Sequence, residues 1–382
     1  MDKEARGRLH GVKVIELTAM ITGPLAGVML ADLGAEVVKV ENPQGGDPFR
    51  DFRGSSYSPY FCTYNRNKQS VTLDLKSEQG REALCDLVRT ADVLIENFRS
   101  GVMDRLGLSD AKLREINPGL IICSITGFGE SGPYVDRPSY DAVGQALSGI
   151  SSLFLSDDAQ ITGPSVVDNL TGMYASHAVL GALFDRQRTG RVRTIQLNML
   201  ECAIAFISDP FANYLMAGVT PDPLMRVRAS QSYALRCRDG ALLAVHMSSP
   251  AKFWLGVQKA LSREDLGSDS RFRSRELRIQ NYELLSKELN RTSLTEDRDH
   301  WLARLVEADV PHAPILTLQE VIDDPQVKHL ETFVEVEHPV HGKQKMIRRP
   351  VRYDRSRDDQ PLVAAPDLGE HSERILESAK PR

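Results

Sequence analysis

Three observations in this 382-residue sequence predict an α/β fold with a Rossmann-like parallel sheet. Short apolar runs alternate with helix-length patterns through the first third of the chain, which is the order of repeated strand–helix–strand units. Helix start and stop residues separate these runs. After residue 205, prolines and a hairpin pattern replace the alternation, which predicts a smaller α+β domain in the middle of the chain.

The pattern places the elements of the large domain in chain order. Strands are expected at 12–17, 36–40, 71–75, 93–95 and 120–125, with helices at 24–33 and 78–89 between them. Gly23-Pro24 marks a helix start, because proline lacks a donor that the first helical turn leaves unused. Ser77 and Ser109 are expected N-caps, and Asn117-Pro118 is expected to end the helix that follows Ser109.

Later elements define the division into domains. A helical pattern at 171–184 runs into basic residues and Gly190, as a helix C-terminus favours, and a strand at 193–197 follows. Asp239-Gly240 lies between two alternating runs and predicts a hairpin over 233–246. Further helices are expected at 252–261, 276–289 and 296–307. The large domain is therefore assigned to 1–205, completed by a C-terminal segment 330–382, and the small α+β domain to 225–325.

Charge and hydropathy exclude several classes of function. Lys and Arg number 47 against 52 Asp and Glu, and no basic face is concentrated, so nucleic acid is not an expected partner. No apolar run reaches the roughly 18 residues that span a bilayer, and residues 1–6 are unlike a signal peptide. We expect a cytoplasmic protein that binds no membrane. Five cysteines without a Cys-x-x-Cys pair predict neither disulfides nor a zinc site.

A glycine-rich segment, residues 127–132, matches Gly-x-Gly-x-x-Gly after a strand. This is half of a dinucleotide-binding fingerprint. The other half is a helix that opens on the last glycine, and Pro133 and Pro138 prevent it. The segment is therefore interpreted as a loop shaped for close backbone approach rather than as an NAD site.

Histidine and serine form no recognisable catalytic or metal-binding motif. The histidines considered are His246, His300, His312, His338 and His341. None has the ligand spacing of a metal site, so packing or surface roles are favoured and no metal is expected. No Gly-x-Ser-x-Gly sequence is present either, which argues against a serine nucleophile.

Asp168 has two readings from the residues alone. It precedes the long helical pattern, where its carboxylate would cap the backbone N–H groups of the first turn. The same position would keep a carboxylate ionised and fixed, which also suits a nucleophile. Arg99, Arg105 and Arg137 are either contacts for an anionic ligand or solvated arginines.

Several segments, taken together, resemble the class III coenzyme A transferases. This CaiB/BaiF family includes formyl-CoA transferase, carnitine CoA-transferase and succinyl-CoA:glutarate CoA-transferase. The similarity covers nearly the whole chain, and its landmarks are residues 11–17, 23–24, 33–41, 65–70, 92–98 and 124–129. Each segment alone is weak evidence, but their order and spacing make the set specific.

The resemblance implies a role for particular residues. The aspartate at the Asp168 position carries the acyl group in that family, and residues that match Leu73, Asn97, Phe98 and Arg105 bind CoA, with Arg105 facing a phosphate. CoA is a substrate there, and no other cofactor is implied. Family members form interlocked homodimers, so the same assembly is expected here.

Three departures limit this transfer. Asn42 stands where formyl-CoA transferase has an arginine, and Pro138 takes the place of its CoA-binding lysine, so Arg137 is a hypothetical substitute. Nothing between residues 219 and 231 resembles the run of four glycines that covers the formyl-CoA transferase site. The way in which this chain shields its intermediates therefore stays open.

The implied mechanism is a covalent relay on Asp168. The carboxylate attacks the donor thioester to form a mixed anhydride, and CoA thiolate then converts it to an aspartyl-CoA thioester, from which CoA returns to the acceptor acid. A carboxylate of ordinary pKa, about 3.9, is already deprotonated at neutral pH, so no general base is expected. Backbone N–H groups of the glycine loop, at Gly127 and Gly129, are candidate oxyanion donors.

Two other functions are weighed against transfer. The 2-methylacyl-CoA racemases resemble the chain too, but where they carry Gly-His-Asp this sequence has Ser139-Tyr140-Asp141, so one proton-transfer partner is missing. A non-catalytic CoA-binding protein is the third reading. Residues 337–343 and 351–353 look closest to dicarboxylate-type members, which favours succinyl-CoA or another short or dicarboxylic acyl-CoA as the donor.

Overall fold

The computed structural model describes residues 7–52, 54, 57–155, 160, 163–248, 250–357 and 361–380. Residues 1–6, on which the signal-peptide argument rests, lie outside these ranges. Contacts divide the chain into two units, Met1–Ala212 with Glu331–Arg382, and Asn213–Leu330. The predicted bounds, 1–205 with 330–382 and 225–325, stay a prediction about domains. No helix in the described ranges is long and apolar enough to cross a membrane, and the cytoplasmic location likewise stays a prediction.

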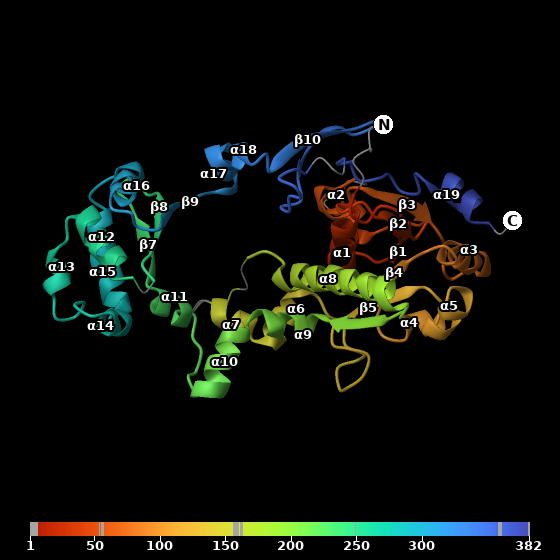
Figure 1. The fold of residues 1–382 in the computed structure, drawn as a ribbon, viewed down its shortest axis with the longest axis horizontal. Helices are drawn as coiled ribbons and strands as arrows, with labels where there is room; N and C mark the ends of the chain where they lie inside the picture. The colour runs from red at the N-terminus through yellow and green to blue at the C-terminus, as the bar shows by residue number, and fades with distance from the viewer. Residues whose placement is uncertain are drawn as a thin grey trace. The chain divides into compact units, whose positions relative to one another are not determined.

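The large unit is built on one parallel sheet of six strands (Figure 1). The strands are β1 (Lys13–Leu17), β2 (Glu36–Glu41), β3 (Lys68–Thr72), β4 (Val93–Glu96), β5 (Ile121–Thr126) and β6 (Thr194–Asn198). Their order, β3-β2-β1-β4-β5-β6, confirms the predicted α/β class. In such sheets ligands bind beyond the carboxyl ends of the strands where the order reverses, which is between β1 and β4.

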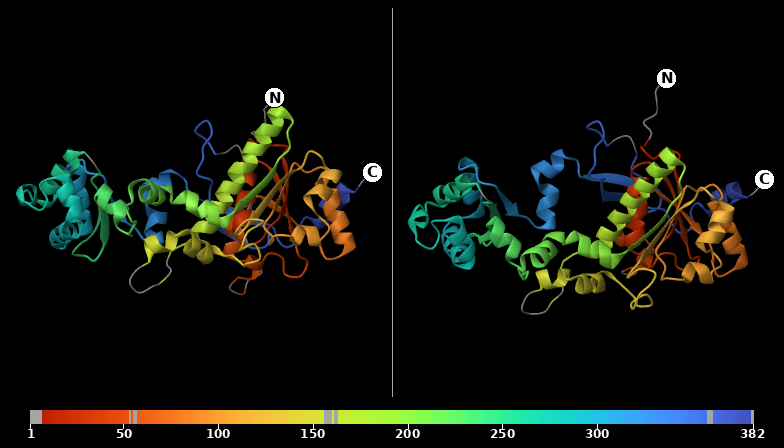
Figure 2. Two further views of the ribbon diagram at one scale, coloured as in Figure 1. Left: turned by 90° about the horizontal axis from the view of Figure 1, so that it is seen from below. Right: turned by 60° about the horizontal axis from the view of Figure 1, so that its bottom comes forward.

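Helices cover both faces of this sheet, and Figure 2 shows the sheet edge-on between them. The helical elements of the first 212 residues are α1 (Thr22–Ala31), η1 (Pro48–Asp51), α2 (Pro59–Asn65), α3 (Glu78–Val88), α4 (Val102–Arg105), α5 (Asp110–Ile116), α6 (Asp141–Ser148), α7 (Ile150–Phe154), α8 (Val166–Thr189) and α9 (Met199–Phe206), with α10 (Ser208–Ala217) crossing into the second unit. Apolar residues of α1 and α8 pack on one face, and those of α3, α5 and the C-terminal α19 (Ser372–Ala379) pack on the other. Strands buried on both faces explain the continuous apolar runs in the sequence.

Most predicted helix ends are confirmed. Ser77 accepts a hydrogen bond from the N–H of Gly80, and Ser109 accepts one from the N–H of Lys112. Asn117 ends α5, and Gly190, with φ of 73°, ends α8. Side-chain oxygens and a left-handed glycine satisfy backbone groups that a helix end leaves unpaired, so these signals act locally and can be read from sequence.

The prediction for the third strand is wrong by several residues. It placed a strand at 71–75, whereas β3 covers Lys68–Thr72. The inward residues Lys68 and Ser70 are polar yet buried, because Lys68 contacts Glu16 and Ser70 contacts Glu41. An apolar pattern cannot reveal a strand whose buried side chains are charged or polar.

The C-terminal segment returns to the large unit. It contains a two-stranded antiparallel hairpin, β10 (Phe333–His338) and β11 (Gly342–Ile347), and ends in α19. Hydrogen bonds join it to the N-terminal part, since Arg50 and Tyr57 donate to the backbone carbonyls of Pro366 and Ala365. All five cysteines are free, as expected.

The second unit is an α+β structure with its own core. Three antiparallel strands, β7 (Ser232–Arg236), β8 (Leu242–His246) and β9 (His312–Ile315), form its sheet, which confirms the hairpin around Asp239-Gly240. Its helices are α11 (Met225–Ser230), α12 (Ala251–Leu261), α13 (Asp265–Ser268), α14 (Arg275–Gln280), α15 (Tyr282–Ser293), α16 (Arg298–Glu307), α17 (Leu318–Asp323) and α18 (Pro325–His329). Trp254, Phe272, Leu285 and Trp301 are among its buried residues.

Candidate active site

A cavity of about 540 Å³ lies at the carboxyl ends of the central strands of the large unit. Residues that follow β1, β4 and β5 line it, together with the start of α8. This is the point where the strand order reverses, so the cavity lies where a ligand is expected in a doubly wound sheet. Of the predicted site residues, Leu73, Asn97, Phe98, Gly127, Arg137 and Asp168 line the cavity, whereas Gly129 and Arg105 are not among its lining residues.

Asp168 lies inside the first turn of α8, and the N-cap prediction for it is wrong. The helix begins at Val166, and Ser165 is the N-cap residue. The capping carboxylate comes from another helix, because the backbone N–H of Asp168 donates to Oδ1 of Asp141 at 3.1 Å. In the part of the chain that the structure describes, no hydrogen bond to the Asp168 side chain is found. Its carboxylate is thus left available to a ligand in the cavity.

Burial, and then the nearby charge of Asp141, raise the pKa of Asp168 to about 7. Both causes disfavour the ionised form, and they outweigh the opposite influence of the helix N-terminus. The expectation of a fully deprotonated carboxylate at neutral pH is therefore wrong. Ionising this carboxyl group costs free energy. The ionised form therefore binds a proton, or forms a bond to an acyl carbon, more readily than an ordinary carboxylate does.

Asp141 and Tyr64 surround the start of α8. The second oxygen of Asp141 accepts a hydrogen bond from Gln145 at 2.5 Å, which fixes the carboxylate on α6. The Tyr64 hydroxyl lies 3.5 Å from Oδ1 of Asn169. Burial raises the pKa of Tyr64, and so do the charges of Asp168 and Asp141, against the lowering effect of the contact with Asn169, so the hydroxyl stays protonated beside the two carboxylates.

Asn97 uses its side chain within the protein. Its amide oxygen accepts from the N–H of Ala19 at 3.0 Å, and its amide nitrogen donates to the carbonyl of Ala19 and to the Thr22 hydroxyl, at 2.9 and 3.1 Å. These contacts fill both donors of the amide. Direct CoA binding by the Asn97 side chain is therefore not what this geometry favours, and the residue instead holds the loop that follows β1.

Phe98 and Leu73 supply apolar walls. Leu73 is buried, and Phe98 is half-buried with its backbone N–H held by Glu96 at 2.8 Å. Burial raises the pKa of Glu96 to about 7. A second carboxyl group, on the residue before the lining residues Asn97 and Phe98, therefore titrates in the same range as Asp168.

The glycine loop after β5 differs from its predicted use. No helix opens on it, as expected, because α6 begins only at Asp141. The N–H of Gly129 donates to the Thr126 hydroxyl at 2.9 Å, so it is not free to stabilise an oxyanion. A Cβ on Gly127 would lie 2.4 Å from that of Ser139, which shows why this close approach requires glycine.

Two hydroxyl groups were missed by sequence reasoning. Thr18 and Ser139 line the cavity, and their hydroxyl oxygens are buried with no hydrogen-bond partner in the described chain. A buried unpaired hydroxyl is costly unless a ligand or water completes it. No sequence motif contains a signal for either hydroxyl group. Each residue is identified only because the structure places it in the cavity lining.

The predicted arginines are separated by the fold. Arg137 lines the cavity and stacks on Tyr134, with its guanidinium carbon 4.0 Å from the ring centre. Arg105 is exposed on α4, next to Gly101, outside the cavity lining. Lys76 and Arg99 also line the cavity, so three cations are available there to an anionic ligand.

Three possible metal ligands, His338, His341 and Asp367, lie close together near the β10–β11 turn. Nδ1 of His338 accepts hydrogen bonds from the N–H groups of Val340 and His341, both at 3.1 Å. A metal-bound imidazole donates from its second nitrogen, and an Nδ1 that accepts cannot do so. His341 contacts Asp367 at 2.8 Å and stacks on Tyr57, so the cluster ties two segments together rather than offering a metal centre.

Comparisons with known proteins place the whole chain in one group. The profile described as CoA-transferase family III matches residues 9–372. Succinyl-CoA:glutarate CoA-transferase of Homo sapiens is 34% identical over 376 residues, covering 96% of this chain and 85% of its own. Succinate--glutarate CoA-transferase of Agrobacterium fabrum is 33% identical over 387 residues, covering 96% of this chain and 94% of its own.

Solved structures agree. A CAIB/BAIF family protein from Brucella suis superposes with a TM-score of 0.85 at 34% identity, covering 98% of this chain and 100% of its own. Rv3272 from Mycobacterium tuberculosis superposes with a TM-score of 0.86 at 32% identity, covering 97% of this chain and 99% of its own. The similarity therefore extends over both units and is not limited to the sheet.

Proposed function

This chain belongs to CoA-transferase family III and is an enzyme that transfers CoA; on that premise, we propose that it does so through a covalent intermediate on Asp168. One observation carries the proposal. The Asp168 carboxylate faces a cavity at the strand-order reversal and makes no side-chain hydrogen bond in the described chain. Its high pKa shows that ionising it is costly, as expected of a reactive carboxylate.

The proposed relay has four steps. The Asp168 carboxylate attacks the donor thioester carbon, forming a mixed anhydride and CoA thiolate. The thiolate attacks the aspartyl carbonyl, forming an aspartyl-CoA thioester and releasing the donor acid. The acceptor carboxylate attacks that thioester, giving a second anhydride and thiolate. The thiolate attacks the new acyl carbon, which yields the product acyl-CoA and regenerates Asp168.

Protonation controls the first step. With a pKa of about 7, Asp168 is only half ionised at neutral pH, and about nine-tenths ionised one pH unit higher. The ionised form needs no general base to attack. Asp141 raises the pKa of the nucleophile while its oxygen holds the N–H of Asp168, so it tunes and orients that side chain.

CoA is proposed to occupy the cavity as a substrate, with no other cofactor and no metal. Leu73 and Phe98 offer apolar surface, and Arg137 lines the cavity and precedes Pro138, which stands at the position of the family's lysine. Arg105 is proposed to meet a phosphate only if the ligand extends beyond the cavity. The Thr18 and Ser139 hydroxyls are proposed as donors to the acyl or acceptor oxygens.

The donor is proposed to be succinyl-CoA or another short or dicarboxylic acyl-CoA. Two relatives at 33–34% identity carry names that pair succinate with glutarate. A panel of acyl-CoA donors against free acids, read by mass spectrometry, tests this. Turnover limited to long-chain monocarboxylic acyl-CoA donors would contradict it.

We also propose an interlocked homodimer. Large apolar side chains lie exposed on the large unit, among them Phe154, Phe184 and Phe206, which are 65%, 59% and 51% exposed. We propose that these side chains contact the partner subunit, since exposed apolar surface marks an interface where it is contiguous. Linked subunits cannot separate without unfolding, so tagged and untagged dimers mixed under native conditions should not exchange. Exchange within hours would exclude linking.

Trapping the intermediate tests the central claim. Hydroxylamine added during turnover should convert Asp168 to a hydroxamate, identified on its peptide by mass spectrometry, and Asp168→Asn is the control. Label on another residue, or none, would contradict the relay. Deuterium incorporation into a 2-methylacyl-CoA would instead indicate the racemase activity.

A further inference from the structure

The loop between β1 and α1 has an unusual backbone. Met20 adopts a φ of 69°, the left-handed region that favours glycine over residues with a side chain. All four residues of the loop, Thr18–Ile21, line the cavity, as does Thr22 at the start of α1. Such a conformation persists only where surrounding contacts determine it.

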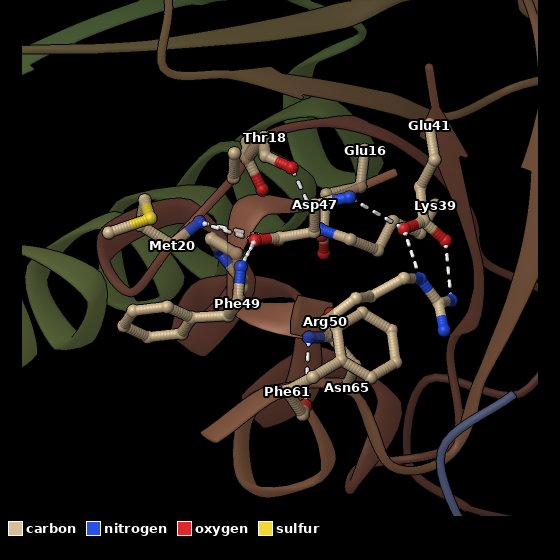
Figure 3. A network of polar contacts seen from close by, with 12 residues as sticks. Glu16, Thr18, Met20, Lys39, Glu41, Asp47, Phe49, Arg50, Phe61 and Asn65 are labelled. Atoms are coloured by element: carbon tan, nitrogen blue, oxygen red, sulfur yellow. Dashed lines mark hydrogen bonds and ion pairs between the residues drawn. The ribbon is translucent and has the colours of Figure 1, made fainter. Parts of the chain in front are cut away.

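A buried lysine and aspartate hold one side of this loop (Figure 3). The Lys39 ammonium contacts the carbonyl of Thr18 at 2.7 Å, Asp47 at 2.9 Å and Glu16 at 3.1 Å. These three acceptors fill its three donors. Asp47 accepts a hydrogen bond from the N–H of Met20 at 3.2 Å. Lys39 and Asp47 therefore bind the backbone on both sides of Ala19.

Asn97 holds the residue between them. Its amide pairs with both the N–H and the carbonyl of Ala19. Four consecutive backbone groups, from the Thr18 carbonyl to the Met20 N–H, are therefore held by side chains of Lys39, Asn97 and Asp47. The loop is a preorganised wall of the cavity rather than a flexible connection.

Lys39 remains charged in this setting. Burial alone would lower the pKa of Lys39, but the carboxylates of Asp47, Glu16 and Glu41 raise it above its usual value. Lys39 lies beneath the loop and is fully buried, so it contacts no ligand itself. Its influence on the cavity passes through the backbone that it holds.

We propose that Lys39 and Asp47 are positioning residues for acyl-CoA binding, and that their ion pair fixes the backbone of Thr18–Met20 in the shape that the CoA moiety contacts. This inference rests on the proposed function, which assigns the cavity to CoA. It differs from a purely structural role, because the effect should appear in substrate affinity beyond any loss of stability.

Lys68 offers a matched control. It is as buried as Lys39 and contacts the same carboxylate, Glu16, at 2.7 Å. Its other partners are the carbonyl of Pro24 and the side chain of Asn65, neither of which lines the cavity. Removing either lysine deprives Glu16 of a buried cation, but only Lys39 holds the loop.

The experiment compares Lys39→Met with Lys68→Met in the full-length enzyme. We expect Lys39→Met to raise the KM for the acyl-CoA donor at least tenfold, with a smaller change in kcat. Lys68→Met should also lower the melting temperature but leave KM within about twofold of wild type. Equal KM values for the two variants would overturn the inference.

Asp47→Asn covers the case in which Lys39→Met does not fold. The amide keeps one acceptor for backbone N–H groups but loses the charge that Lys39 binds. We expect a KM increase of threefold or more, with faster hydrogen–deuterium exchange in a peptide that contains residues 18–22. Wild-type exchange and wild-type KM in this variant would also overturn the inference.

Phe98→Ala separates this inference from the proposed function. If Phe98→Ala leaves the KM for acyl-CoA unchanged, the cavity is not the CoA site, and the proposed function loses its location. If Phe98→Ala raises KM while the two lysine variants behave alike, only the positioning role is wrong.

Discussion

Two groups of buried charge in the large unit are built on opposite principles. Beneath the β1–α1 loop, three acids and three bases form one compensated network: Glu16, Glu41, Asp47, Lys39, Arg50 and Lys68. At the start of α8, Asp168 and Asp141 lie together, and neither makes an ion pair within the described chain.

The network beneath the loop has a structural role, whereas the pair at the start of α8 contains the group proposed to react. In the network, opposite charges keep Lys39 and Glu41 ionised: burial alone would raise the pKa of Glu41, but Arg50 and Lys39 hold it below its usual range. Burial has the larger effect at Lys68, where it lowers the pKa to about 8 although Glu16 is in contact. In the pair, burial and like charge act together and raise the pKa of Asp168 to about 7. Lys39 and Glu41 therefore keep their charge near neutral pH, whereas the uncompensated Asp168 is ready to gain a proton or an acyl group.

The largest expected effect comes from removing the reactive carboxylate. Asp168→Ala should lower CoA transfer by at least about a thousandfold, because no other group in the relay can carry the acyl and then the CoA. Steady-state turnover of succinyl-CoA with glutarate measures it. A folded variant with near wild-type turnover would place the chemistry elsewhere.

Breaking the compensated network should cost stability instead. Lys39→Met leaves Glu16 and Asp47 buried without that cation, so the free energy of unfolding should fall by roughly 3–5 kcal/mol. The partly exposed pair Arg89–Asp86, 3.2 Å apart, is the control. Arg89→Ala should change the free energy by less than about 1 kcal/mol. Equal losses in urea unfolding would mean that burial does not distinguish these pairs.

Removing the uncompensated charge of Asp168 should increase the stability of the protein. The folded pKa of Asp168 lies above its unfolded value near 4, so the stability contributed by this group is present below pH 4 and is lost as pH rises through about 7. Asp168→Asn should therefore raise the free energy of unfolding by roughly 1–4 kcal/mol at pH 8, with the gain vanishing toward pH 4. A gain that is independent of pH would refute this cause.

The fold could be predicted from the sequence more fully than the arrangement of the buried charged residues. Alternating apolar runs and helix caps such as Ser77 identify most of the sheet and helices, because burial and capping act on neighbouring residues. Glu16, Lys39 and Lys68 are charged residues within strands, and this exception to the apolar pattern was the available signal for the network.

The site was less accessible to sequence reasoning. Resemblance pointed to Asp168, Leu73 and Phe98, all of which line the cavity. It could not show that Asp141 supplies the cap or that Asn97 is occupied by Ala19, since both contacts join residues far apart in the chain. The pKa of a carboxyl group depends on burial and on such partners, which is why the expectation of an ordinary value failed.

The smallest expected effect is a shift in the pH profile. In wild type, kcat/KM should rise with pH and level off above an apparent pKa near 7, because only ionised Asp168 attacks. Asp141→Asn keeps an oxygen for the N–H of Asp168 but removes the like charge. Its apparent pKa should fall by roughly one pH unit, yet stay above the ordinary aspartate value because burial is the larger cause.

The variant Glu96→Gln tests whether the rise of kcat/KM with pH reflects the ionisation of Asp168. Burial raises the pKa of Glu96 to about 7 as well, and its oxygen holds the N–H of Phe98 at the cavity edge. Glutamine retains an acceptor for this N–H without titrating, so the profile should stay at its wild-type position. If the rise of kcat/KM with pH disappears in Glu96→Gln and is unchanged in Asp141→Asn, the titrating group is Glu96. The uncompensated pair would then not be what sets the pH dependence of transfer.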